Sequence, residues 1–223
     1  MIRLEKGQNH AIGMNKFHAG LGWDVREDNS TGYDFDLDVS AFMLGSNKKL
    51  ISDDYLVFYN SESRLKVDSD GNLLYPLKIT PHTFWSSNEE MRHKSRPVDP
   101  ELSVIGSLDD ESGETSEDGD DETMDFDLSK ISTKVQEIII CVSIFDYKQR
   151  KQNFGQVERA YVRLYRPGQA DGEGEFLYDL TEDFSACASV EFCRLYRKND
   201  EWKIQALGLG HNGGLEELLS KYN

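Results

Sequence analysis

Short apolar runs that alternate with polar residues dominate this chain and constrain its fold more than any other feature. Between 36 and 41, two aspartates and a serine alternate with leucine, valine and alanine. A period of two puts successive side chains on opposite faces of a β-strand, so the apolar set faces a core and the polar set faces away. The run 138–142 is continuous and largely β-branched, which predicts a strand buried on both faces in the middle of a sheet.

Similar short runs recur along the rest of the chain. The many short strands, with turn signals between them, favour a mainly β protein built as a two-sheet β-sandwich. The apolar stripe of Leu215, Leu218 and Leu219 predicts a short C-terminal helix over 215–221 that packs on the sandwich, and a shorter helical piece is expected near 148–152. Further strands are predicted at 56–59, 124–128, 161–165, 176–180, 190–196 and 202–207, with a turn at Asn199-Asp200.

The length of 223 residues suits a single domain over 1–223 that carries an insertion. Periodicity is weak at about 76–108, which predicts an inserted, partly ordered loop. An acidic loop at 109–122 follows it, and from 97 to 129 there are 13 acidic residues and no basic ones. One long disordered linker is the alternative interpretation of this region.

Charge limits the classes of partner. The 41 acidic side chains outnumber the 25 basic ones, which leaves a net charge of −16. Such a surface repels nucleic-acid phosphates, so no nucleic-acid partner is expected. It also repels anionic lipid unless a cation intervenes. Metal cations and basic protein surfaces are therefore the expected partners.

The cysteines and the N-terminal segment suggest where the protein works. Cys141, Cys187 and Cys193 are odd in number and form no CxxC pattern, which predicts reduced, partly buried thiols in a cytosolic protein. The N-terminal residues contain no apolar signal region, and no stretch approaches the roughly 20 apolar residues that a membrane helix needs. The expected location is the cytoplasm, with peripheral docking at the inner face of the membrane as the alternative.

Two acidic clusters carry the strongest chemical signal. Asp36 and Asp38 stand two apart on a predicted strand, so both carboxylates leave the same face about 7 Å apart. Like charges so close repel unless a cation lies between them. The second cluster, 118–122, is acidic and contains a glycine. Together they supply the six to eight oxygen ligands that Ca²⁺ takes, whereas the scarcity of histidine and the absence of thiolates here argue against zinc or copper.

Several other motifs are weaker than they look. An EF-hand starting at Asp34 is excluded, because Val39 stands where its glycine belongs and Gly45 where its bidentate glutamate belongs. The segment 68–72 is interpreted as a hairpin turn, with a calcium loop as the alternative. The GxGxxG string at 208–213 lacks a second parallel strand and a downstream acid, so we interpret these glycines as a tight turn into the last helix. Nucleophile, metalloprotease, Walker and kinase motifs are missing, and no enzymatic activity is expected.

Eight strings occur in an order that resembles one known family. They are GLGWD at 20–24, FDLDVSAF at 35–42, VFYN at 57–60, GDDE at 119–122, QNFGQV at 152–157, LYR at 195–197, EWK at 201–203 and GGL at 213–215. The ordered set resembles the TerD family of tellurium-resistance and calcium-binding stress proteins. The resemblance covers the chain outside about 76–108.

The resemblance implies a two-sheet β-sandwich that binds two neighbouring calcium ions at one end. It also implies a role in tellurite resistance and the general stress response, together with a TerC-type membrane protein and a TerB-type protein. Asn60 enters the set of candidate ligands through the resemblance alone. Carried over by position, the implied ligands are Asp24, Asp36, Asp38, Asn60, Asp118, Asp120, Asp121 and Glu122.

The chain departs from the family pattern in three places. It carries the insertion described above, its acidic loop is about two residues longer than usual, and Phe145 replaces the usual histidine before Asp146. The first two departures leave the ligands of the second calcium open.

Three functions follow from these patterns. The leading hypothesis is a calcium-binding stress-response module that acts through calcium-dependent protein interaction. The second is calcium-bridged membrane docking, in which Phe84-Trp85 and the basic segment 92–96 of the insertion would contact lipid. The third, a metal-assisted hydrolase, is disfavoured because calcium generates hydroxide poorly and no general base is evident.

Overall fold

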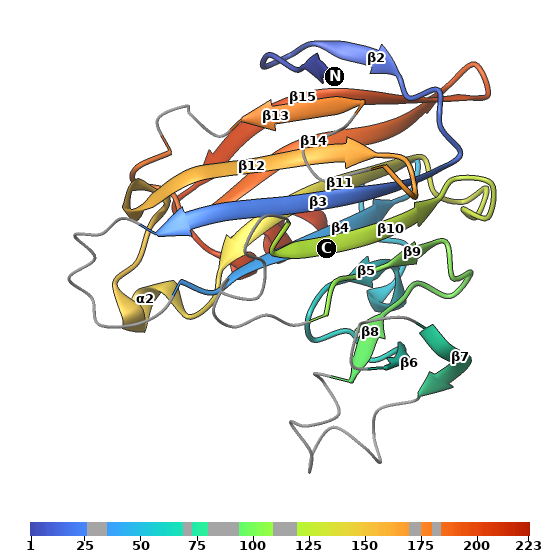
Figure 1. Ribbon diagram of the computed structural model, residues 1–223, viewed down its shortest axis with the longest axis horizontal. Coiled ribbons are helices and arrows are strands. Elements are labelled where there is room, and N and C mark those ends of the chain that lie inside the picture. Colours follow the sequence, from blue (N-terminus) through green and yellow to red (C-terminus); the bar gives the residue numbers. More distant parts are fainter. Residues whose placement is uncertain (26–34, 69–72, 80–93, 109–119, 170–174, 180–183) are drawn as a thin grey trace.

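A computed structural model describes residues 1–25, 35–68, 73–79, 94–108, 120–169, 175–179 and 184–223. Two large sheets form two layers, and a small third sheet lies at one end of them (Figure 1). The first sheet has the order β1 (Ile2–Arg3), β13 (Phe176–Asp179), β12 (Val157–Tyr165), β3 (Lys16–Val25), β10 (Glu122–Asp127) and β9 (Val104–Ile105). The second has the order β2 (Asn9–Ala11), β15 (Glu201–His211), β14 (Ser189–Lys198), β11 (Glu137–Ile144), β4 (Leu37–Leu44) and β5 (Leu56–Val57). The predicted mainly β, two-sheet fold is confirmed.

The main core lies between the two large sheets. In β3 the alternate residues Phe17, Ala19 and Leu21 are almost completely buried, as the period-two pattern requires. From the second sheet, Leu37 and Ile138 join the same cluster. Each such strand contributes one face to this core and leaves the other for different contacts.

β11 occupies the middle of the second sheet. It pairs antiparallel with β4 on one side and with β14 on the other. Its residues point alternately into two apolar clusters, so Ile138 lies in the main core while Ile139 lies in a second cluster on the opposite face. The prediction of a strand buried on both faces is therefore confirmed.

The second apolar cluster lies beneath the C-terminal helix α3 (Leu215–Tyr222). Leu218 is fully buried there against the outer face of the second sheet, where Phe42 and Ile139 also lie. Tyr222 reaches into the same layer and its hydroxyl donates a hydrogen bond of 2.7 Å to the buried carboxylate of Glu191. The predicted helix packs on the sandwich as its leucine stripe requires.

The glycines at 208–213 do not all form the expected turn. Gly208 and Gly210 lie inside β15, and Gly208 has a φ of 55° next to a register shift between β14 and β15. A left-handed residue at a β-bulge is a position that favours glycine. Only Gly213 and Gly214 precede α3, so the interpretation as a turn is wrong for the first two glycines.

Short strands lie within and just before the segment expected to be an insertion. β7 (Leu73–Ile79), β6 (Arg64–Val67) and β8 (Ser95–Pro97) form the small sheet, and β9 pairs with β10 at the edge of the first sheet. The Phe84-Trp85 pair lies outside the described residues, as do Arg92 and His93 of the basic segment 92–96. The boundaries of the insertion therefore stay a prediction.

Two short elements and the thiols complete the fold. The helix α2 (Tyr147–Arg150) follows β11, close to the helical piece expected near 148–152, and two 3₁₀ turns cover Asp53–Tyr55 and Phe154–Gln156. Cys141 and Cys193 are buried thiols, and Cys187 is partly buried. Among the described residues, no helix has the length and apolarity that a membrane span requires.

Candidate functional site

The start of β4 presents the aspartate pair as the sequence predicts. Leu37 and Val39 enter the main core, so Asp36 and Asp38 lie on the opposite face of the strand. Both carboxylates are nonetheless well covered, with 6% and 3% of their surface exposed. Asp38 is opposite Ser143 of β11, and Arg150 of α2 lies with Nη1 3.7 Å from Asp36 Oδ2.

The start of β10 brings two more acids close to this strand. Glu122 is buried, and its Oε2 accepts a hydrogen bond of 2.6 Å from the backbone N–H of Val39. Asp121 Oδ2 accepts a hydrogen bond of 2.9 Å from the backbone N–H of Trp23 in β3. The acidic residues at the start of β10 therefore connect the ends of β3 and β4, although these strands belong to different sheets.

A hollow of about 340 Å³ opens beside Asp38. Its polar lining includes Ser143, Asp146 and Glu216, and Lys148 of α2 also contributes to it. Asp146 adopts a left-handed conformation with a φ of 48°, a region that aspartate tolerates better than most residues. Sequence patterns did not single out Asp146 or Glu216, because they come from the α2 turn and from α3, which only the fold brings to β4.

An aromatic side chain forms the rim of this hollow. Phe145 is 39% exposed, and its ring lies 5.6 Å from that of Tyr59 in an edge-on arrangement. The guanidinium of Arg150 lies 5.2 Å from the centre of the Phe145 ring. Phe145 thus takes part in a cation–π contact of a kind worth about 0.5–1 kcal/mol at an exposed site.

Asp120 takes a different place from its two neighbours. Its Oδ1 accepts hydrogen bonds from Arg163 Nε at 2.7 Å and from the Tyr161 hydroxyl at 3.1 Å, on the outer face of the first sheet. Its side chain lies directly over Gly20, where a Cβ atom would come within 1.8 Å of Oδ2. Glycine at position 20 therefore makes room for the carboxylate.

The charges around Asp120 shift the pKa values of its neighbours. Burial lowers the pKa of Arg163, but the hydrogen bond and the negative charge of Asp120 raise it by more. Burial, followed by the charge of Asp120, raises the pKa of Tyr165 to about 12. At neutral pH Arg163 is therefore charged, and the phenols of Tyr161 and Tyr165 are neutral.

Asp125 organises a second charged group on the same outer face. Its Oδ1 lies 2.5 Å from His18 Nδ1, and its Oδ2 accepts a hydrogen bond of 2.9 Å from Arg96 of β8. Burial raises the pKa of Asp125, but the hydrogen bond with His18 and the charge of Arg96 lower it by more. Arg96 also donates to the carbonyl oxygens of Gly106 and Thr123, so it ties the small sheet to the sandwich.

The remaining candidates are spread more widely. Asp24 alternates with the buried Trp23 on β3, which places it on the outer face of the first sheet, opposite Glu158 of β12. Asn60 lines a different pocket, together with Phe58 and Ser61. Asp118 lies outside the described residues, as does the acidic segment 109–119.

The comparison with protein families decides the relationship of this chain. The model of the family described as "TerD domain" matches residues 1–70 and 85–222. This chain belongs to the TerD family. The match leaves out 71–84, a narrower gap than the insertion expected at 76–108.

Individual TerD relatives cover almost the whole length. The chain is 36% identical over 227 residues to the tellurium resistance protein TerD of Serratia marcescens, covering 99% of this chain and 96% of that protein. It is 33% identical over 226 residues to general stress protein 16U of Bacillus subtilis, with 99% and 96% coverage. The crystal structure of a TerD homologue from Streptomyces coelicolor A3(2) superposes with a TM-score of 0.60 at 15% identity, covering 93% of this chain and 96% of that one. The family is thus one of tellurium-resistance and stress-response proteins, and the last comparison supports the fold.

The donor chemistry of the acidic end fits a hard cation such as calcium. Asp36, Asp38, Asp121 and Glu122 offer carboxylate oxygens, the ligand type that Ca²⁺ prefers. Within the described ranges, however, no three acidic, histidine or cysteine side chains are grouped closely enough to hold a metal. The segment that holds Asp118 is not among those ranges. We conclude that these carboxylate oxygens are of the type that binds Ca²⁺, and we propose the set of ligands below.

Proposed function

We propose that this TerD-family protein is a calcium-binding stress-response module that acts by calcium-dependent interaction with a partner protein. The observation that carries the proposal is the burial of Asp36 and Asp38 on one face at the start of β4. Glu122 also contacts this strand, because it accepts a hydrogen bond from the N–H of the adjacent Val39. Aspartate and glutamate are rarely buried unless their charge is compensated. A divalent cation compensates two carboxylates at once.

The ligands that we propose come from β4 and from the start of β10. Asp36, Asp38, Asp121 and Glu122 would contribute oxygens, with Asp118 completing the set. Bound calcium would supply positive charge and so remove the repulsion among these carboxylates. Arg150 supplies one positive charge beside Asp36 and holds α2 near the site.

Asp24, Asn60 and Asp120 remain family-implied ligands, but their surroundings favour other roles. Asp24 and Asp120 face the outer side of the first sheet, and Asp120 is bonded to Arg163. The proposal therefore places the cation between β4 and β10 rather than over the outer face. The hollow beside Asp38, with Phe145 on its rim, would lie next to the bound ion and offers a surface for a partner.

The negative net charge favours partner proteins that present a basic surface. A TerC-type membrane protein and a TerB-type protein are the partners that family membership suggests. We further propose a cytoplasmic, non-enzymatic protein.

Calorimetry and thermal melting test the proposal together. At calcium about 100-fold above Kd, each site adds about 2.7 kcal/mol of stability, which for a domain of this size raises Tm by about 5–10 °C. The double variant Asp36→Asn/Asp38→Asn should lose both the heat of binding and the rise in Tm. The exposed pair Asp200→Asn/Glu201→Gln removes the same charge elsewhere and should keep them. A wild-type protein that neither binds calcium nor gains stability in millimolar calcium would exclude the function proposed here.

A further inference from the structure

A second pocket, separate from the aspartate pair, lies between the edge strand β5 and the C-terminal helix. It encloses about 510 Å³. Ligand pockets in proteins typically measure about 300–1,000 Å³. Its apolar lining comes from Leu50, Leu56, Phe58, Val98 and Leu219. The pocket therefore has the size and the apolar lining of a small-molecule site.

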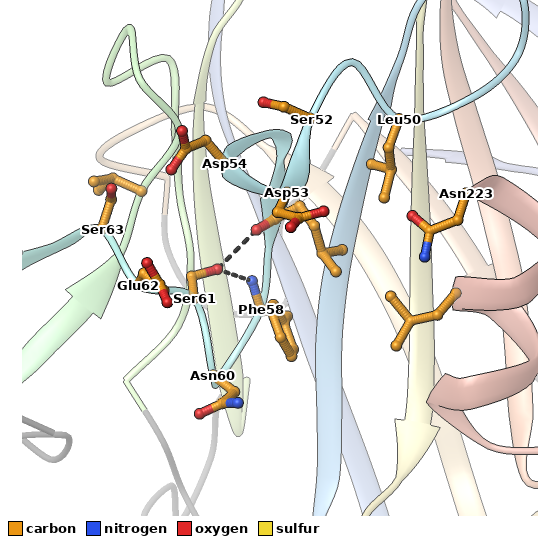
Figure 2. A pocket seen from close by; sticks show the side chains of 13 residues that line it. Leu50, Ser52, Asp53, Asp54, Phe58, Asn60, Ser61, Glu62, Ser63 and Asn223 are labelled. Atoms are coloured by element: carbon orange, nitrogen blue, oxygen red, sulfur yellow. Dashed lines mark hydrogen bonds between the residues drawn. The ribbon is translucent and has the colours of Figure 1, made fainter. Parts of the chain in front are cut away.

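The rim of this pocket is acidic. Asp53 and Asp54 of the 3₁₀ turn and Glu62 line it, and all three are exposed. Figure 2 shows Asp54 and Glu62 on one side of the opening, with Leu50 and Asn223 on the other. No lysine or arginine is among the lining residues that the structure describes. The pocket thus combines an apolar lining with a rim of negative charge.

Lys49, which precedes the lining residue Leu50 in the chain, is engaged elsewhere. Lys49 Nζ donates hydrogen bonds to the carbonyl oxygens of Lys221 at 3.0 Å and Asn223 at 2.7 Å, at the end of α3. For Asp53, Asp54 and Glu62, the described part of the chain shows no ion pair. A cation that enters the pocket would therefore meet carboxylates that are available to it.

The edge of the sheet is closed to an added strand at this point. Ser61 Oγ donates to the carbonyl oxygen of Leu56 at 2.8 Å and accepts from the N–H of Phe58 at 2.9 Å, as the dashed lines in Figure 2 show. An extended peptide that adds to a sheet edge needs such backbone groups for its own hydrogen bonds. The occupant is therefore a compact molecule rather than a β-strand of another protein.

We propose that this pocket binds a small organic cation that has an apolar body, of the alkylammonium class. The hydrocarbon part lies on the leucine and phenylalanine lining, and the ammonium group faces the carboxylates of Asp54 and Glu62. This site uses neither Asp36 nor Asp38, so it goes beyond the calcium-dependent function and does not depend on it.

Titration of the whole chain with n-hexylammonium tests the site, in a chelator so that the calcium proposal has no bearing on the result. Amide NMR shifts locate the bound amine, and calorimetry gives its Kd. n-Hexanol has the tail without the charge, and ethylammonium has the charge without the tail. The affinity for ethylammonium should be lower by at least about tenfold, because its tail buries four fewer methylenes. n-Hexanol should bind about five- to tenfold more weakly, because it lacks the charge that faces both carboxylates.

Matched variants separate the rim from general electrostatics. Asp54→Asn/Glu62→Gln should weaken n-hexylammonium about five- to tenfold, because each exposed carboxylate contributes modestly to an ion pair. Asp200→Asn/Glu201→Gln removes the same charge from the exposed β14–β15 turn and should leave Kd unchanged. Leu50→Ala should weaken the amine by a similar factor by removing part of the apolar lining, with melting curves confirming that the variant is folded.

Four results would overturn the inference. The first two are equal binding of n-hexylammonium by the rim variant and the wild type, and equal binding of n-hexanol and n-hexylammonium. The other two are amide shifts that map away from residues 50–63, and binding of a Lys- and Leu-containing peptide when the amine does not bind. The last outcome would identify a protein docking site instead.

Discussion

Asp120 offers the sharpest test of how the structure divides the acidic residues, because it stands beside two proposed ligands yet pairs with an arginine. In Asp120→Asn, the amide oxygen can keep accepting from Arg163 and Tyr161. The amide nitrogen takes the place of Oδ2, which has no hydrogen-bond partner among the described residues. The substitution therefore removes the negative charge opposite a buried guanidinium, and it also buries an amide N–H2 group that has no acceptor there.

The burial of this pair sets the magnitude. The side chains of Arg163 and Asp120 are 4% and 3% exposed, so solvent screens their interaction weakly. Breaking a buried ion pair by removing one partner costs about 3–5 kcal/mol. Because the hydrogen bonds survive here, we expect the lower end, about 3 kcal/mol. For a chain of this size, that corresponds to a fall in Tm of about 6–12 °C.

Urea and thermal denaturation in a chelator measure this loss, and the same experiment in millimolar calcium distinguishes the two roles. Asp120→Asn should be less stable in both conditions but should retain the calcium-dependent rise in Tm. A spectrophotometric titration gives a second readout, because burial and then Asp120 raise the pKa of Tyr165 to about 12. Removing the charge should lower that pKa while burial keeps it above its ordinary value. The reasoning fails if Asp120→Asn is as stable as the wild type in chelator but loses its response to calcium, since Asp120 would then be a ligand.

Three further predictions follow from other contacts. Tyr222→Phe removes a hydrogen bond to the buried Glu191 carboxylate and should cost about 1.5–3 kcal/mol by urea denaturation, whereas Tyr147→Phe should cost little. Asp125→Asn should destabilise the protein at neutral pH. The lowered pKa of Asp125 gives stability above the unfolded value of about 3.9 that is lost as the pH falls, so melting curves of variant and wild type should converge below about pH 4. Gly20→Ala should lower Tm, because its Cβ would overlap the carboxylate above it, and an unchanged Tm would show that this layer is loosely packed.

Much of the fold was readable from local pattern. The alternation at 36–41 correctly assigned the two faces of β4, since side-chain direction in a strand depends only on position in the chain. The continuous run at 138–142 correctly placed β11 inside a sheet, and the leucine spacing located α3. By contrast, Gly208 and Gly210 were assigned to a turn, because a local motif does not reveal that a strand passes through a bulge.

The sequence by itself determined where the carboxylates lie along the chain, that the aspartates at the start of β4 share a face, and to which family the order of motifs points. Only the tertiary structure decided which contacts each acidic residue makes. It set Asp120 against Arg163, which lies 43 positions along the chain, and Glu122 against the N–H of Val39, which lies 83 positions away. It also built the acidic, apolar pocket from β5, the 3₁₀ turn and α3. These contacts depend on which strands of two sheets come to face each other, and that arrangement follows from burial of the whole core rather than from any local pattern.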